Sequence, residues 1–417
     1  MFARVPIAIS LALTGVCGYA AIDGWGRALA VVASVPFELA AAYSLSVVPL
    51  FILMGAVASR AQMSRELFDA ANAIFSGFRG ALASATIGAC AAFGAICGSS
   101  IATAATFSKV AIPEMRRHGY HDVVAAGSVA AAGTLGILIP PSVILAVYSL
   151  VAEQSLAKLF AAALIPGILL AVLYVIAVVI EARLRPAWMP LVAAMPLRER
   201  LRAARGMWKL VLLFFFAVVG IYLGWFSPTE GAAVSAFAAI LIGFATRTLT
   251  LRGLADAMLE TVFSTAMLFF IVVGAFIFSR FIVLTRLPNE LVAWVNQAGL
   301  APLAIVLAVI VLYVVLGTAL EEVSTILITV PVILPLMTNL GYDGIWFGIF
   351  VTVMATIGLI SPPVGLTVFV IQAQNPDIPA ARIYRGTLPF LVADLVLVAL
   401  LVAFPALALW LPAALKM

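Results

Sequence analysis

The feature that most constrains this chain is a pattern of glycines and prolines that occurs twice, 222 residues apart. The first copy contains Pro113, Gly119-Tyr120, Gly136 and Pro140-Pro141, and the second contains Pro335, Gly341-Tyr342, Gly358 and Pro362-Pro363. Both double prolines lie inside apolar segments, at 133–151 and 357–371. Because a proline lacks the backbone N–H and crowds the preceding turn, neither segment can form a continuous helix.

Composition places these broken helices in a membrane. Of the 417 residues, 65% are hydrophobic and 10% are charged, and the mean hydropathy is +1.22, whereas soluble domains are about 25% charged. The sequence therefore predicts an all-α polytopic membrane protein in a lipid bilayer. A helix broken at membrane depth frees backbone groups that an ion, a solute or water must satisfy, and two such segments in corresponding halves indicate a transporter binding site.

Sequence motifs of the common ATPases and hydrolases are absent from the chain. The chain has no Gly-x-x-x-x-Gly-Lys, His-Glu-x-x-His or Gly-x-Ser-x-Gly motif, so we expect neither ATP hydrolysis nor an enzyme of the common hydrolase classes. Two histidines, His118 and His121, and three scattered cysteines are too few for a transition-metal site. The formal charge of +5 is concentrated in one loop between apolar spans, which indicates membrane topology rather than nucleic-acid binding.

Apolar runs of about 20 residues predict membrane spans. We place them at 5–22, 40–59, 158–182, 207–225, 228–246, 257–284 and 386–412. Residues 23–39 could hold a short extra span, so the side of the N-terminus stays open. Charged residues interrupt the apolar pattern at 62–78 and 286–298, which is typical of interfacial amphipathic helices.

Two longer apolar runs, 80–112 and 300–339, have polar centres at 98–100 and 317–322. Each arm is long enough to dip into the membrane and return, so the sequence predicts two re-entrant helical hairpins. Two ordinary spans joined by a short turn are the alternative.

The distribution of cations predicts the orientation of the chain. Seven cations and one acid lie in the loop 183–209, which places this loop in the cytoplasm. Five crossings separate the span at 40–59 from its repeat partner at 257–284, so the two halves form an inverted repeat. Inversion brings both hairpin tips and both broken helices together near the midplane.

Oxygen-bearing side chains gather in these four elements. They are Ser99, Ser100, Thr103, Thr106, Thr134 and Ser142 in the first half, and Thr318, Glu321, Glu322, Ser324, Thr325, Thr356, Ser361 and Thr367 in the second. Hydroxyls, carboxylates and freed carbonyls are hard ligands that suit Na⁺. Helix N-termini at the breaks and tips can face a carboxylate, so the parts predict uptake of an organic anion coupled to Na⁺.

The acidic pair Glu321-Glu322 is costly within an apolar hairpin unless it is solvated or coordinated. One of the two carboxylates is expected to bind the coupling ion. In the alternative, neither acid binds an ion: one lies in a water-filled tip and the other is paired with a basic group.

Five motifs resemble the large membrane subunit of tripartite ATP-independent periplasmic (TRAP) transporters, of the ion transporter superfamily. They are FGAICGSSIATAA at 93–105, GY at 119–120, GILIPPS at 136–142, PTE at 228–230 and GLISPPVG at 358–365. The resemblance covers nearly the whole chain. It implies a Na⁺-coupled elevator in the bacterial inner membrane, multi-pass, with a separate small four-helix membrane subunit and a periplasmic substrate-binding protein as partners.

The resemblance and the polar inventory together predict the site. The expected Na⁺ ligands are Gly98, Ser99, Ser100, Thr103, Gly133, Thr134, Gly136, Gly317, Glu321, Glu322, Thr325, Thr356 and Gly358. The expected substrate contacts are Ser99, Pro140, Pro141, Ser142, Ser361, Pro362, Pro363 and Gly365. Many relatives carry an aspartate four residues after the glycine of the second tip, where this chain has Glu321 followed by Glu322.

The expected domain organisation alternates a scaffold with a transport domain. The scaffold comprises 1–79, 158–299 and the C-terminal span 381–417, and the transport domain comprises 80–157 and 300–380. Two rival functions remain at this stage: a binding-protein-independent Na⁺/carboxylate carrier of the same superfamily, and a passive channel. The identity of the organic acid does not follow from the sequence.

Overall fold

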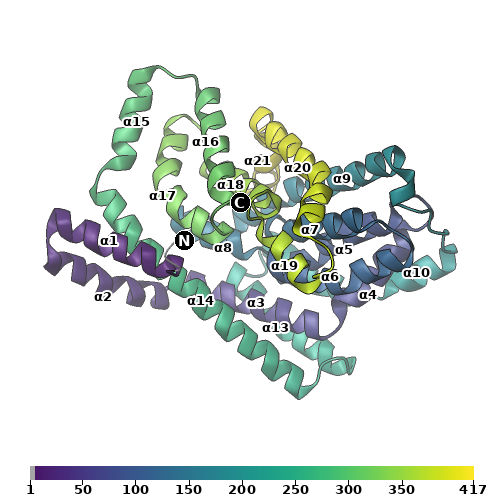
Figure 1. Cartoon of the computed structure of the whole chain (residues 1–417). Helices are drawn as coiled ribbons and strands as arrows, with labels where there is room; N and C mark the ends of the chain where they lie inside the picture. The colour runs from purple at the N-terminus through teal and green to yellow at the C-terminus, as the bar shows by residue number, and fades with distance from the viewer. Residues whose placement is uncertain (1–4) are drawn as a thin grey trace.

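The computed structural model describes residues 5–417, and all regular elements of that part of the chain are helices (Figure 1). Six helices are long and apolar enough to cross a membrane, or up to eight if each of two bent pairs is counted as one span. The expected all-α polytopic architecture is confirmed at this level.

Helix boundaries repeat with the same 222-residue offset as the sequence motifs. α6 (Ser100–Arg117) corresponds to α17 (Glu322–Asn339), and α7 (Asp122–Leu138) corresponds to α18 (Gly344–Ile360). The flanking helices α5 (Ala81–Cys97) and α8 (Val143–Val151) match α16 (Pro302–Gly317) and α19 (Leu366–Gln374) to within two residues. Each half therefore contains two helices joined at a polar tip, followed by a helix that is interrupted at its double proline, as the sequence predicts.

The Gly-Tyr motif forms the same turn in both halves. Gly119 and Gly341 adopt φ values of +76° and +87°, a left-handed conformation that glycine adopts without steric cost. The following N–H groups of Tyr120 and Tyr342 donate to carbonyls of the preceding helix at 3.0 Å in both cases. The repeated glycine thus ends one helix so that the next, broken helix can begin three residues later.

α7 and α18 form the centre of the fold. Every residue from Val123 to Leu138 and from Ile345 to Ile360 is buried, and a helix that is apolar all round must be enclosed by protein or lipid. Around them pack α5, α6, α9 (Leu156–Leu184), α16, α17, α19 and α20 (Ala380–Ala403). The closest approach is between α7 and α20, where a Cβ added to Gly386 would lie 2.0 Å from the carbonyl oxygen of Val123 and one added to Gly127 would lie 2.4 Å from the carbonyl carbon of Gly386.

A second group of helices contains α1 (Ile7–Asp23), α3 (Val47–Arg60), α13 (Pro228–Ala245) and α14 (Leu251–Leu284). α2 (Trp25–Ala41) lies beside α1 and α14, at the left of Figure 1. α2 thus covers most of the segment 23–39, and with 17 residues it is not among the candidate spans. A short 3₁₀ turn, η1 (Tyr43–Ser46), leads into α3.

The two predicted interfacial segments are helices that hold the hairpins. α4 (Met63–Phe75) packs against α5, and α15 (Leu287–Ala298) packs against α17. Both follow a non-glycine residue in the left-handed conformation, Gln62 (φ 61°) and Arg286 (φ 58°). The backbone turns sharply at both residues, so that α4 and α15 point away from the spans that precede them.

Two spans differ from the sequence prediction. The expected span 386–412 is two helices, α20 and α21 (Ala406–Ala414), because Pro405 cannot donate the N–H that a continuous helix requires. The expected span 207–225 is α11 (Trp208–Phe214), a π segment (Phe215–Val219) and α12 (Gly220–Tyr222). It follows the basic loop, which contains the 3₁₀ turn η2 (Pro186–Trp188) and α10 (Leu197–Arg205).

Candidate functional site

The first hairpin tip lies directly on the first broken helix. A Cβ added to Gly94 would lie 2.4 Å from the Cα of Gly136, and one added to Gly98 would lie 3.1 Å from the carbonyl oxygen of Pro141. Gly98 itself has φ +63° and ends α5, while the Ser99 hydroxyl caps α6 by accepting from the N–H of Ala102 at 3.3 Å. The tip is thus a two-residue turn of small residues that brings its backbone onto the break.

Unpaired oxygens converge at this contact. Ser100 Oγ and Thr103 Oγ1 are fully buried and have no hydrogen-bond partner. A Cβ on Gly136 would lie 3.1 Å from Thr103 Oγ1 and 3.3 Å from the carbonyl oxygen of Ser99. Buried hydroxyls without partners are costly, and this set of hard oxygen donors fits a Na⁺ ion. Of the predicted Na⁺ ligands, the structure therefore brings Ser99 and Thr103 next to Gly136, whereas Gly98 contacts the Pro141 carbonyl and Ser100 begins α6 directly after the tip.

Gly133 lies one turn away from these oxygens, and its position is explained by packing. A Cβ added there would lie 2.7 Å from the Cβ of Ala104.

The second hairpin contacts the second broken helix through glycines in the same way, but its tip carries acids in place of serines. A Cβ added to Gly358 would lie 2.7 Å from the Cα of Gly317. Glu321 precedes the first residue of α17, and its Oε1 accepts from Ser324 Oγ at 3.1 Å, while Thr325 Oγ1 donates to the Glu321 carbonyl at 2.9 Å. The neighbouring Glu322 has a buried Oε2 with no partner. Both acids benefit from the positive end of α17.

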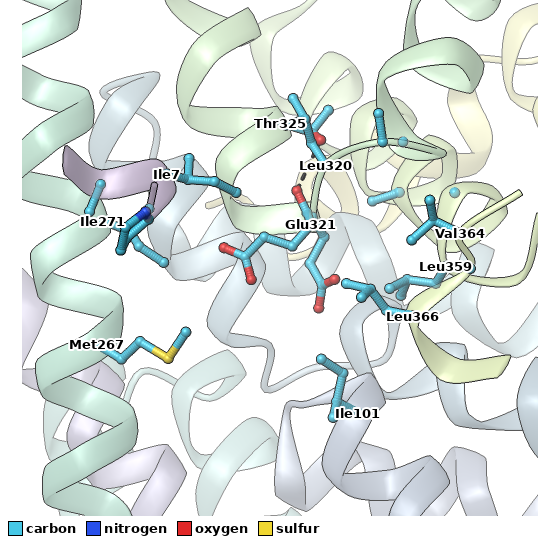
Figure 2. Close-up of a pocket in the computed structure, with 18 of the residues that line it drawn as sticks. Ile7, Ile101, Met267, Ile271, Leu320, Glu321, Thr325, Leu359, Val364 and Leu366 are labelled. Carbon is cyan, nitrogen blue, oxygen red and sulfur yellow. Dashed lines mark hydrogen bonds between the residues drawn. The ribbon is translucent and has the colours of Figure 1, made fainter. Parts of the chain in front are cut away.

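Two cavities meet at this acidic pair. One of about 600 Å³ lies between α14, the second tip and the second break, and another of about 550 Å³ lies between α3, α14 and the first tip. Both are lined by Ile101, Met267, Ile271, Glu321 and Glu322. Figure 2 shows Glu321 at the centre of the larger cavity, with Met267 and Ile271 on one side and Leu359, Val364 and Leu366 on the other. The remaining predicted residues on the larger cavity are Gly317, Thr325, Gly358 and Gly365, and those on the smaller one are Gly98 and Ser99.

The lining is acidic. No lysine, arginine or histidine from residues 5–417 lines either cavity, whereas Glu260, Glu321 and Glu322 do. Glu260 is paired with Arg60, with an Oε2 to Nη2 distance of 2.7 Å. Glu321 and Glu322 make no such pair among the described residues, so a cation or water must compensate whichever of them is ionised.

At the breaks themselves, side-chain hydroxyls satisfy freed carbonyls. Pro140-Pro141 and Pro362-Pro363 each contain a cis peptide bond. Ser142 Oγ donates to the Ile137 carbonyl, and Thr367 Oγ1 donates to the equivalent Leu359 carbonyl at 2.8 Å. The hydroxyl of Tyr384 lies 3.0 Å from the carbonyl oxygens of Pro363 and Val364. Pro140, Pro141, Ser142, Ser361, Pro362 and Pro363 do not line the two cavities.

Thr134 and Thr356 lie away from the hairpin tips, in a separate buried cluster. Their hydroxyls contact Tyr174 on α9 and Asp394 on α20, at 3.4 Å each, and Tyr174 and Asp394 are 2.8 Å apart. We did not foresee Tyr174 or Asp394 as site residues from the sequence. The available signal was that Asp394 is the one charged residue in the apolar run 386–412.

Two repeated hairpins that rest on two broken helices, around an acidic cavity in an apolar helical body, define a membrane transporter. The chain belongs to the family of the DctM component of tripartite ATP-independent periplasmic transporters, whose family model matches residues 1–407. This finding confirms the resemblance noted from the motifs.

Curated relatives agree. The chain is 39% identical to the C4-dicarboxylate TRAP transporter large permease protein DctM of Pseudomonas aeruginosa, over 90% of this chain and 88% of that protein. It is 32% identical to the sialic acid TRAP transporter large permease protein SiaM of Vibrio cholerae, over 89% and 86%. It is 30% identical to the ectoine/5-hydroxyectoine large permease protein UehC of Ruegeria pomeroyi, over 88% and 86%.

Solved structures with the same fold are more distant in sequence. The YdaH transporter of Alcanivorax borkumensis superposes with a TM-score of 0.67 at 15% identity, over 98% of this chain and 97% of that one. MtrF of Neisseria gonorrhoeae, from a class of antimetabolite efflux pumps, gives a TM-score of 0.56 at 13% identity, over 95% of each chain. At such identities the likeness concerns the fold alone.

Proposed function

We propose that this permease subunit carries out Na⁺-coupled uptake of an organic acid that a periplasmic binding protein delivers. The observation that carries the proposal is that buried oxygens of Ser100, Thr103 and Glu322, next to the two hairpin tips, have no hydrogen-bond partner, and that Glu322 lines both cavities. An ion gradient supplies the energy, because the sequence has no ATP-hydrolysing motif.

Na⁺ plays two parts in this account. At the first tip it is held by the carbonyl and hydroxyl oxygens around Gly136, and at the second tip it balances the charge of Glu321 or Glu322. Its positive charge also draws the substrate carboxylate into a cavity that would otherwise repel an anion. Substrate then contacts Ser99, the breaks at 140–142 and 361–363, and Gly365 once the tips have moved from the arrangement described above.

We further propose that the two halves are inverted and that the body around α7 and α18 moves as an elevator against α1, α3, α13 and α14. α4 and α15 connect each hairpin to the preceding span during this movement, since each packs on one hairpin. In contrast to the division expected from the sequence, we include α9 and α20 in the moving body, because both pack on the broken helices. Glycines at the closest contact, Gly127 and Gly386, make that packing tight.

The partners in this proposal are a small four-helix membrane subunit and the periplasmic binding protein, with the complex located in the bacterial inner membrane and the basic loop 183–209 in the cytoplasm. The relatives' names point to a C4-dicarboxylate, sialic acid or ectoine as the first substrates to test.

Reconstitution tests the proposal. The chain is placed in liposomes with its candidate small subunit, with or without the candidate binding protein, and uptake of each of the three substrates is followed under Na⁺ or K⁺. We expect accumulation only with Na⁺ and the binding protein. Accumulation by the chain alone would favour the binding-protein-independent carrier, and equilibration without accumulation would favour a channel.

A further inference from the structure

The basic loop 183–209 contains a short helix, α10, whose outer face combines apolar and cationic side chains. Leu197 and Leu201 are exposed to 72% and 59% and lie one turn apart on the same side of the helix. Exposed arginines form a neighbouring stripe at the same helical spacing, at Arg198, Arg202 and Arg205. The outer face of α10 is therefore amphipathic, with leucines next to arginines.

Contacts at both ends of α10 fix it along α4. Near its start, Arg200 Nη2 donates to the Ser76 carbonyl and the Met195 N–H donates to Ser76 Oγ, both at 3.0 Å. Ser76 directly follows the last residue of α4. Beyond the other end of α10, Lys209 Nζ lies 2.7 Å from Oε1 of Glu66, which is in the first turn of α4. These contacts set the orientation of α10, so that its outer face points away from the protein.

The arginines of this outer face have no counter-charge within the described chain. Lys209 is paired with Glu66, as above, and Arg185 is paired with Glu181 at 3.2 Å. In contrast, Arg198, Arg202 and Arg205 form no ion pair with any residue from 5 to 417. The one acid of α10, Glu199, is exposed and is outnumbered by these arginines. The face is thus free to bind an anionic surface from outside the chain.

The position of α10 places this face at the edge of the bilayer. Two residues separate it from α11, and the two helical segments are bent by 48° at that point. Trp208, the first residue of α11, is exposed to 51%, and tryptophan at the end of an apolar span is typical of the membrane interface. An amphipathic helix in this position lies in the interface, with its apolar stripe toward the acyl chains and its cations among the headgroups.

We propose that α10 is a docking surface for anionic phospholipids, whose phosphates bind the three arginines while Leu197 and Leu201 enter the acyl region. Arginine suits this role, because its planar guanidinium can donate two parallel N–H groups to phosphate oxygens. A dissolved anion would engage the arginines alone, whereas an anionic lipid engages both stripes. Bound lipid holds α4 at the membrane surface, and α4 packs on the first hairpin. The inference does not depend on the proposed substrate or coupling ion.

The test compares phosphatidylglycerol, which is anionic, with phosphatidylcholine of the same acyl chains, which has no net charge. The purified full-length chain in neutral detergent is titrated with each lipid, and retained lipid is counted by native mass spectrometry. Each cation near an anionic surface strengthens binding about fivefold. We therefore expect the combined change Arg198→Gln, Arg202→Gln and Arg205→Gln to weaken phosphatidylglycerol binding about tenfold or more and to leave phosphatidylcholine binding unchanged.

Two further variants separate the charge of α10 from other effects. The matched control removes three exposed cations outside the loop, by Arg27→Gln, Arg286→Gln and Lys416→Gln, and should bind phosphatidylglycerol as wild type does. Lysine at all three arginine positions of α10 keeps the charge and should retain most of the binding. Melting temperatures in lipid-free detergent should agree among all variants, because the replaced side chains are exposed.

Two results would overturn the proposal. One is wild-type binding of phosphatidylglycerol by the glutamine variant of α10. If the same variant no longer retained the candidate small subunit during co-purification, the surface would belong to a protein partner instead. The other is an equal loss of phosphatidylglycerol binding in the matched control, since that would mean that the net charge of the chain, and not the outer face of α10, decides the preference.

Discussion

Gly94 of the first hairpin and Gly136 of the first broken helix lie backbone against backbone, with 2.4 Å between an added Cβ on Gly94 and the Cα of Gly136. The repeat forms the same type of contact between Gly317 and Gly358. Small residues allow helices in a membrane to approach this closely. Each hairpin is thereby held against a broken helix.

Alanine at these glycines should loosen both tips. Gly94→Ala and Gly358→Ala force a methyl group into backbone contacts, and overpacking of this kind costs about 1–3 kcal/mol. We expect lower melting temperatures and at least tenfold slower uptake. Gly26→Ala is the control, because a Cβ there meets nothing within 4 Å. Unchanged uptake in both tip variants would mean that the close contacts are dispensable.

Removal of the unpaired hydroxyls at the first tip should weaken Na⁺ activation. We expect Ser100→Ala and Thr103→Val to raise the Na⁺ concentration for half-maximal uptake about tenfold, equivalent to about 1.4 kcal/mol, with normal expression. Ser235→Ala is the control, since Ser235 is equally buried but lies in α13 and donates to the Gly231 carbonyl at 2.6 Å. A Na⁺ titration of uptake compares the three variants. Identical half-saturation in all of them would assign the two hydroxyls to packing.

The two adjacent acids should differ in function. Glu321 lies at the centre of the cavity and already accepts a bond from Ser324, whereas Glu322 has an unpaired oxygen. We expect Glu322→Gln to raise the half-saturating Na⁺ concentration and to change the charge moved per substrate, and Glu321→Gln to have the smaller effect. Uptake currents measured at several Na⁺ concentrations distinguish them. If neither substitution changed the Na⁺ dependence or the charge moved, the pair would only line a water-filled cavity.

An exposed ion pair predicts a small dependence on pH. The Arg116 guanidinium bonds to Asp377, in the loop between α19 and α20, and holds the pKa of Asp377 below its ordinary value. The contribution of this carboxylate to stability is therefore fully present at pH values above the ordinary aspartate pKa, and it is lost as the pH falls through the lowered pKa. Asp377→Asn should flatten the acid side of the stability profile, whereas Glu290→Gln should not. A steeper loss of stability at acid pH in Asp377→Asn than in wild type would contradict the predicted direction of the effect.

Proline removal tests the function of the breaks. Pro140→Ala with Pro141→Ala, or the same pair of changes at Pro362 and Pro363, should favour helix continuation across a break. We expect normal insertion into the membrane and loss of uptake. Pro166→Ala, inside the continuous helix α9, provides the control. Wild-type uptake by either double variant would show that the breaks are not required.

Much of the architecture could be predicted because proline and glycine act locally. The 222-residue offset in the sequence reappears in the bounds of α6 and α17, and of α7 and α18. The split of the last span at Pro405 follows from the same local rule, but the apolar run across it concealed the break. The orientation of the halves and the division into scaffold and moving body stay predictions.

The site could be predicted only in part, because some of its contacts depend on tertiary packing. Small polar residues at a turn identified Ser100 and Thr103, whose hydroxyl oxygens are both buried without a partner, and the Thr103 oxygen lies beside Gly136. Thr134 was grouped with the same tip because it lies on the same broken helix, yet its hydroxyl faces α9. The pairing of Tyr174 with Asp394 joins residues that are 220 positions apart and have no common motif.

Na⁺-dependent accumulation is the most direct test of the central claim. The chain, the candidate small subunit and the candidate binding protein are reconstituted in liposomes, and uptake of a labelled C4-dicarboxylate is compared in inward Na⁺ and inward K⁺ gradients of equal size. Our account predicts accumulation above equilibrium only with Na⁺, and its collapse when an ionophore dissipates the Na⁺ gradient. Equal accumulation in Na⁺-free buffer would contradict it.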